Sequence, residues 1–294
     1  MKESLLPGRQ YSSDSWCPNP WLYAYGRPFP EKEIQFLVSN CLKQIDLPRG
    51  LWYEPGAGTG RIIRAIAKQY PSQEICATEV TKEMFRVLDF TCVTENLVNV
   101  ERTCIDARVY TPETPVTLLI LSSLLHLMTD WQSFLHYLVS LARSRSWILL
   151  IGERGDIYEA LLGSPQSGSD PVLMEVCGKY VDERSRLGIP LERRSFVGPQ
   201  WTEDNKEIVE EIVKLGYEEV SCATVEWTHR FRLLDVQNIV VERLYSSMFT
   251  ADEETYNDVV KCWKASLENW SPETFMQSRH SATARLLARS VTIG

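Results

Sequence analysis

The sequence predicts an α/β fold built on a doubly wound, mostly parallel sheet with helices on both faces and a helical lid. Three observations predict it. Between about residues 35 and 153, apolar segments of strand length alternate with segments of helical periodicity. Residues 116–122 (VTLLILS) are apolar almost throughout, which is typical of a strand covered on both faces. A glycine-rich turn, GAGTG at residues 56–60, joins the first strand to the next helix.

The elements of this alternation can be assigned in order. Apolar runs predict strands at residues 51–54, 74–79, 98–106, 116–122 and 146–153. Helical spacing of apolar residues predicts helices at 35–45 and at 61–70. Thr81 and Asp130 can each cap a further helix, because their side-chain oxygens can accept from free N–H groups of the first turn. Strands alternating with helices in this way favour a parallel sheet.

The alternation breaks after residue 153. We interpret residues 155–201 as a lid insertion over the carboxyl edge of the sheet, with a helix at 172–187, and residues 1–34 as an N-terminal cap. A helix beginning at Thr202, a strand through Trp227, helices at 233–247 and 253–270 and a closing strand at 281–291 complete the prediction. Residues 1–294 are expected to form a single domain.

Composition limits the classes of function. The chain has 294 residues, 44% of them hydrophobic and 24% charged, and a formal net charge of −8. An acidic balance argues against a nucleic-acid partner, which would favour a basic face. No segment approaches the roughly 20 continuous apolar residues of a membrane span. The eight cysteines form no C-x-x-C pair, so we expect no metal site and a cytoplasmic protein with reduced thiols.

The glycine-rich turn is the strongest local signal. Glycine lets the backbone approach a ligand closely and adopt positive φ angles, and the helix that follows offers free N–H groups. A dinucleotide fingerprint would read G-x-G-x-x-G, but Arg61 occupies the position of its last glycine. A phosphate loop would need a Gly-Lys-Ser/Thr sequence, which does not follow.

Two acids lie at the ends of the next two strands. Glu79 ends the second strand, where a carboxylate can accept hydrogen bonds from both hydroxyls of a ribose. Asp106 ends the third strand and could accept a hydrogen bond from an adenine amino group. Either acid alone could equally be a helix cap or part of a solvated loop. Together with Glu54 and the glycine turn, they favour a nucleoside ligand.

Residues 23–153 resemble the class I S-adenosylmethionine-dependent methyltransferases, of the small-molecule, type 11-like group. The resemblance is carried by YEPGAGTGRI, CATEVTKEMF, CIDARVYTP, LILSSLLHLMTDW and SWILLIGE, with YGRPFP before the first strand. Glu54 and Glu79 stand where aspartates are common in that family. The resemblance implies a Rossmann-like sheet, methyltransferase activity and S-adenosyl-L-methionine as the cofactor.

The resemblance also implies which residues bind the cofactor. Those expected to contact it are Tyr25, Arg27, Glu54, Gly56, Gly58, Gly60, Glu79, Val80, Met84, Asp106, Ala107 and Ser122. Glu79 would hold the ribose, with Val80 and Met84 near the adenine. Arg27 would meet the carboxylate of the cofactor, with a loop salt bridge as the alternative.

The sequence says less about the residues that contact the methyl acceptor. The sulfonium of the cofactor already activates the methyl group, so the protein mainly aligns donor and acceptor. His126 is the candidate general base, with packing after the fourth strand as the alternative. Glu153, at the end of the fifth strand, could orient a substrate. Aromatic and sulfur-containing side chains expected to contact the substrate are Trp21, Tyr23, Met174 and Tyr180.

We therefore expect methyl transfer to an oxygen or nitrogen of a small, apolar or aromatic molecule, of the kind found in secondary metabolism. The alternatives are a carboxylate or lipid-like acceptor, or a protein that binds S-adenosylmethionine without catalysis. Arg61 argues against a nicotinamide-dependent oxidoreductase. Neither a membrane nor a nucleic acid is expected as a partner.

Overall fold

The computed structural model describes residues 19–43, 45–46, 49–164, 168–189, 199, 205–243 and 252–289. Seven strands form one sheet in the order β3-β2-β1-β4-β5-β7-β6. Strands β3, β2, β1, β4 and β5 run parallel, and β7 runs antiparallel to both of its neighbours. The expected α/β fold with a doubly wound, mostly parallel sheet is confirmed.

The parallel half of the sheet places the glycine turn and the two acids at one edge. Its strands are β1 (Leu51–Pro55), β2 (Ile75–Glu79), β3 (Val100–Cys104) and β4 (Val116–Ser122). The chain winds outward from β1 to β3 and then returns to place β4 on the other side of β1. The carboxyl ends of β1 and β4 therefore flank a topological switch point, where open α/β sheets leave a crevice.

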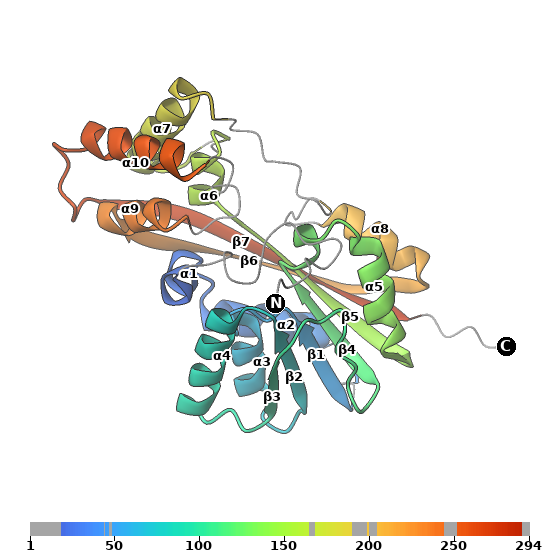
Figure 1. Ribbon diagram of the computed structural model, residues 1–294. Helices are drawn as coiled ribbons and strands as arrows, with labels where there is room; N and C mark the ends of the chain where they lie inside the picture. The colour runs from blue at the N-terminus through green and yellow to red at the C-terminus, as the bar shows by residue number, and fades with distance from the viewer. Residues whose placement is uncertain are drawn as a thin grey trace, which may run out of the picture.

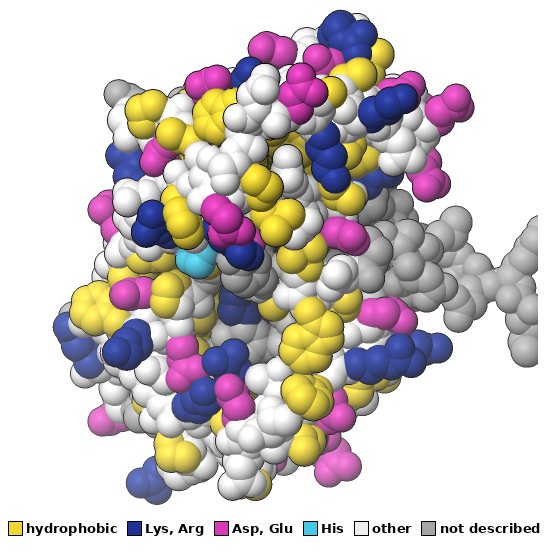
Figure 2. All heavy atoms as spheres, turned by 90° about the vertical axis from the view of Figure 1, so that its left-hand side faces the viewer, with side chains coloured by type: hydrophobic (Ala, Val, Ile, Leu, Met, Phe, Trp, Pro, Cys, Tyr) yellow, Lys and Arg dark blue, Asp and Glu magenta, His cyan; other side chains and the backbone are white. Residues whose placement is uncertain are grey.

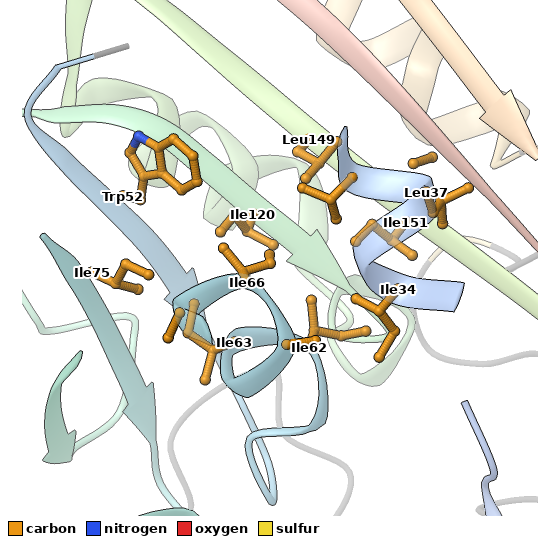
Figure 3. Packing of buried hydrophobic residues seen from close by; sticks show 14 of the residues in the cluster. Ile34, Leu37, Trp52, Ile62, Ile63, Ile66, Ile75, Ile120, Leu149 and Ile151 are labelled. Carbon is orange, nitrogen blue, oxygen red and sulfur yellow. The ribbon is translucent and has the colours of Figure 1, made fainter. Parts of the chain in front are cut away.

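Helices cover both faces of this part of the sheet (Figure 1). One face carries α2 (Glu31–Leu42), α3 (Arg61–Gln69) and α4 (Lys82–Thr94), and the other carries α5 (Trp131–Ser140) and α8 (Lys206–Lys214). Alternate strand residues enter the two cores, as the two-residue period of a strand requires. Figure 3 shows the first of these cores, where isoleucines of α3 meet Trp52, Ile120, Leu149 and Ile151 of the sheet.

Two of the other three strands are longer than their predicted ranges of 146–153 and 281–291, and the third was predicted only as a strand through Trp227. The three strands are β5 (Ala142–Gly155), β6 (Tyr217–Arg232) and β7 (Phe275–Arg289). These three strands extend beyond β1, β2, β3 and β4 to a second group of helices, here called the cap (Figure 1). The cap consists of α6 (Asp156–Leu161), α7 (Pro171–Arg186), α9 (Leu233–Val241) and α10 (Glu253–Ser266), which share a separate hydrophobic core.

This arrangement changes the interpretation of the lid. Helices α6 and α7 of the cap come from the expected insertion. Helices α9 and α10 of the cap come from residues 233–266, which lie outside that insertion. The described residues leave out 165–167, 190–198 and 200–201 of the expected insertion and 1–18 of the expected N-terminal cap. The described part of the N-terminal cap includes α1 (Pro20–Gly26), which begins at the N-cap Asn19.

Among the described residues, no helix combines the length and the apolar character needed to cross a membrane. The same residues contain no group of three or more His, Cys, Asp or Glu side chains placed to hold a metal ion.

Candidate functional site

A cavity lies at the carboxyl ends of β1, β2 and β4, at the switch point of the sheet. The expected cofactor and substrate residues that line it are Tyr23, Arg27, Glu54, Gly56, Gly58, Glu79, Val80, Asp106, Ala107 and Ser122. Figure 2 shows the side of the molecule that carries α1 and α4, where basic and acidic side chains lie near one another.

The glycine turn has the backbone geometry that its sequence predicts. Gly56, Gly58 and Gly60 have φ angles of 64°, 60° and 83°, in the left-handed region that favours glycine. A Cβ at Gly58 would meet no atom within 4 Å, whereas a Cβ at Gly60 would lie 2.5 Å from Cδ1 of Leu88. Gly58 therefore faces open space at the cavity, and Gly60 packs against α4 and is not among the lining residues.

Glu79 joins the end of β2 to the glycine turn. Its Oε2 accepts a hydrogen bond of 2.9 Å from the N–H of Gly58, and its Oε1 accepts one of 2.7 Å from the N–H of Thr81. The residue is 7% exposed. An ionised carboxylate offers roughly four acceptor positions, and Glu79 is one of the residues that line the cavity. One side chain thus both orders the turn and presents oxygen to the cavity.

Glu54 is a second acid on the cavity wall, and it is almost fully buried at 3% exposure. Burial raises the pKa of Glu54 to about 8, and the nearby Arg61 offsets this only in part. Its Oε2 has no hydrogen-bond partner among the described residues. At neutral pH this carboxyl group is therefore mostly protonated and can donate a hydrogen bond.

Asp106 lies on the cavity wall beside Ala107. It forms an ion pair of 2.7 Å with Arg108 and accepts a hydrogen bond of 2.9 Å from the Arg108 N–H. The side chains of Asp106 and Arg108 are 13% and 14% exposed. The arginine fixes the orientation of the carboxylate at the end of β3.

A cluster of one acid and two arginines lies at the carboxyl end of β5. Arg61 contacts Glu153 with two hydrogen bonds of 2.7 and 2.8 Å, and Arg27 forms an ion pair with the same carboxylate. Burial alone would raise the pKa of Glu153, but the charges of Arg27 and Arg61 hold it at about 2. The Arg27 guanidinium also donates to the Tyr23 hydroxyl at 2.5 Å. Arg27 and Arg61 line the cavity, and Glu153 does not.

Comparison with solved structures identifies the fold. The chain is similar to a candidate methyltransferase from Bacillus halodurans C-125, with a TM-score of 0.50 and 13% sequence identity over 88% of this chain and 100% of that one. The chain has the class I methyltransferase fold.

Two further structures give TM-scores of 0.48. Phosphoethanolamine N-methyltransferase 2 of Haemonchus contortus, solved with phosphomonomethylethanolamine and S-adenosylhomocysteine, is 12% identical over 92% of this chain and 56% of that one. The YcgJ protein of Bacillus subtilis is 14% identical over 88% and 99% of the two chains. No protein-family model and no curated protein sequence matches this chain.

Within this fold, several expected site residues lie away from the cavity. Met84 is 0% exposed and belongs to the core of the cap. Tyr180 is also 0% exposed and packs edge-on against Trp263, and Met174 packs against the same core. Trp21 is exposed and packs against Phe90 at 5.5 Å. The side chain of Tyr25 lies outside the described parts of the structure.

His126 lies in a short 3₁₀ helix, η1 (Leu125–Leu127), after β4. It is buried and is not among the residues that line the cavity. Burial, followed by the nearby charge of Arg27, lowers the pKa of His126 to about 3. A base works best with a pKa near the working pH, so this environment favours the packing role over proton transfer.

The cavity also contains residues that the sequence did not single out as its walls. Arg61 entered the analysis only as an argument against a dinucleotide fingerprint. Ser123 lines the cavity with a φ angle of 48°, which is unusual for a non-glycine residue. After it, Leu124, Leu127 and Met128 form an apolar part of the wall. The signal available for this wall was the apolar sequence LLHLM after β4, which does not reveal which side chains face the cavity.

Proposed function

We propose that the protein is an S-adenosylmethionine-dependent methyltransferase that acts on an oxygen or nitrogen of a small acceptor molecule. The observation that carries this proposal is the hydrogen bond between Glu79 and the N–H of Gly58, which brings the glycine turn and the second acid together on one cavity. The class I methyltransferase fold supports it.

The described residues fit the cofactor chemically. Gly58 leaves open space for close approach, and Glu79 offers carboxylate oxygens for the two hydroxyls of a ribose. Asp106 and Ala107 lie at the end of β3, where an adenine ring would be placed, and Arg27 offers a cation for a carboxylate. S-adenosylmethionine supplies a methyl group that its positively charged sulfur activates. The chain then has to bind, align and exclude water.

The walls of the cavity favour an acceptor with an apolar or aromatic part. Tyr23 and the side chains of Leu124, Leu127 and Met128 provide aromatic, aliphatic and sulfur-containing surface. The low pKa of His126 makes a proton-abstracting step at this histidine unfavourable. A neutral amine attacks without first losing a proton, so it would need no base from this histidine.

Cofactor binding tests the proposal directly. S-adenosylhomocysteine at 100 times its Kd should stabilise the folded protein by about 2.7 kcal/mol and raise its Tm, whereas NAD should not. Calorimetry that shows NAD binding, with no response to S-adenosylhomocysteine, contradicts the proposal. Turnover with a panel of amine and hydroxyl acceptors then separates an enzyme from a protein that only binds the cofactor.

A substitution at Glu79 locates the binding site. Glu79→Ala should weaken S-adenosylhomocysteine binding by about 1–3 kcal/mol, because hydrogen bonds to a charged acceptor are lost and the turn is loosened. Glu83→Ala is the matched control, since Glu83 lies in the first turn of the following helix with a side chain 42% exposed. If the two folded variants bind S-adenosylhomocysteine with equal affinity, the ribose does not bind at Glu79.

A further inference from the structure

Three charged side chains from distant parts of the sequence converge beside the cavity. Both guanidinium groups contact one oxygen atom, Oε1 of Glu153, and Arg61 also donates to Oε2 at 2.8 Å. Arg27 follows α1, Arg61 is the first residue of α3, and Glu153 lies in β5. The Glu153 side chain is 12% exposed, so this carboxylate is largely shielded from water.

The same contacts fix the segment that follows α1. Arg61 donates a hydrogen bond of 3.0 Å to the carbonyl oxygen of Arg27, and its guanidinium lies 5.5 Å from the centre of the Phe29 ring. Phe29 stacks on Trp227 of β6 at 4.6 Å, and the Trp227 indole donates to the carbonyl oxygen of Pro28 at 2.9 Å. Residues 27–29 are therefore held between α3 and the β6–β7 hairpin.

Glu153 is what allows the two cations to lie together. Without its charge, two guanidinium groups would face each other in a site that water reaches poorly, and their repulsion would be weakly screened. Arg61 is further disfavoured because a cation at the first position of a helix opposes the helix dipole. Arg27 follows a helix of only seven residues, whereas Arg61 belongs to α3, so we expect the side chain of Arg27 to be the one that shifts when Glu153 is replaced.

We propose that Glu153 is a positioning residue that holds Arg27 in the cavity wall and thereby gives the site its affinity for ligands with a carboxylate end. Glu153 acts through Arg27 and does not line the cavity itself. The cluster carries a net charge of +1 from two arginines and one glutamate, and Arg27 brings that charge to the cavity wall. This inference rests on the proposed function, because the carboxylate in question is that of the cofactor.

Two ligands that differ at this end test the inference. S-adenosylhomocysteine carries the amino-acid carboxylate, and 5′-methylthioadenosine has the same adenosyl thioether without it. In Glu153→Gln, calorimetry should show the Kd of S-adenosylhomocysteine rising about tenfold or more, since a charge-assisted contact is lost. The Kd of 5′-methylthioadenosine should change by less than about twofold.

The chain offers a matched control. Glu31 also receives two cations, Arg64 at 3.0 Å and Lys68 at 2.8 Å, but it does not line the cavity. Glu31→Gln should leave both affinities within about twofold of the wild type. Glu153→Asp keeps the charge on a shorter side chain and should give an intermediate loss for S-adenosylhomocysteine alone. This variant carries the test if Glu153→Gln does not fold.

The other outcomes are distinguishable. Equal losses for both ligands would indicate general loosening of the site and overturn the positioning role. An unchanged or tighter S-adenosylhomocysteine complex in Glu153→Gln would also overturn it, because Glu153 would then be irrelevant to Arg27 or a competitor for it. If the wild-type protein binds neither ligand, the proposed function itself fails, and this inference fails with it.

Discussion

The carboxyl group of Glu54 illustrates how burial controls the charge of a single residue at the end of β1. Burial raises the pKa of Glu54 to about 8, from 4.5 in an exposed carboxyl. Between these two values the folded protein holds a proton that the unfolded chain releases. Stability therefore falls as pH rises through this range, and the penalty stays constant above pH 8.

Replacement of this group should remove that pH dependence. Glu54→Gln keeps the size of the side chain and cannot ionise, so its stability relative to the wild type should increase from pH 5 to pH 8. The slope of this difference should be at most about 1.4 kcal/mol per pH unit. Urea unfolding of both proteins at pH 5, 6.5 and 8 measures it, and titrations of other groups cancel in the difference. A constant difference would mean that Glu54 is ionised in the folded state.

His126 does not line the cavity, although Leu124, Leu127 and Met128 around it do, and its environment is unsuited to a base. Because its pKa is lowered to about 3, we predict that His126→Asn keeps kcat within about threefold of the wild type while its Tm falls. Activity is to be measured per folded molecule across the neutral pH range. A drop of about 100-fold or more at unchanged stability would instead identify His126 as the base.

At the scale of elements, the predicted ranges were most accurate where the local sequence alone determines the strand. β4 matches its predicted range, and β1 and β2 differ from theirs by one residue at an end, because apolar runs bounded by turns specify them. The bounds of β6 were not predicted, since much of this strand alternates between exposed and half-buried residues and carries little apolar signal. The helix α1 was missed although Asn19 and Pro20 form a typical helix start.

The residues of the candidate site also differ in whether the local sequence could predict them. Glu79, Asp106 and Ser122 could be found because each lies at or just after the end of a strand, and strand ends meet at one edge of a parallel sheet. Tyr180 could not be placed, since helical periodicity identifies an apolar face but not the element that covers it. The pair Arg61–Glu153 joins residues 92 positions apart, and no local pattern indicates such a contact.

The contact between the glycine turn and α4 gives a prediction at this scale. Gly60→Ala should destabilise the protein by about 1–3 kcal/mol beyond backbone strain, because the added methyl group would overlap Leu88. Gly216→Ala is the matched control, with a similar φ of 85° and open space at the Cβ position. Urea unfolding should show the larger loss for Gly60→Ala, and Leu88→Ala should relieve part of it in a double-mutant cycle. Equal losses for the two glycine variants would contradict this packing role.

At the scale of the whole molecule, the cap and the sheet share three long strands. The cap has its own hydrophobic core, but β5, β6 and β7 pass continuously from it into the sheet (Figure 1). β6 and β7 pair over their full lengths, from Tyr217 with Arg289 to Arg232 with Phe275. Separating the cap from the sheet would require breaking these strands in the middle, so we expect one cooperative unit.

Trp263 in α10 allows this cooperativity to be tested. It is 0% exposed, packs edge-on against Tyr180 at 5.6 Å and donates a hydrogen bond of 3.0 Å to the carbonyl oxygen of Val176. Trp263→Ala should destabilise the protein by about 3–5 kcal/mol, because it leaves a large cavity in the cap core. Trp21→Ala is the control, since Trp21 is 56% exposed, and it should cost less than about 1.5 kcal/mol.

The form of the unfolding curve decides the outcome. If the continuous strands couple the cap to the sheet, Trp263→Ala should shift a single transition, and circular dichroism and tryptophan fluorescence should report the same midpoint. The substitution would then also destabilise the sheet, although Trp263 belongs to the core of the cap and to neither core of the sheet. A separate early transition in Trp263→Ala, with the main transition unmoved, would show that the cap unfolds on its own and that the chain contains two units.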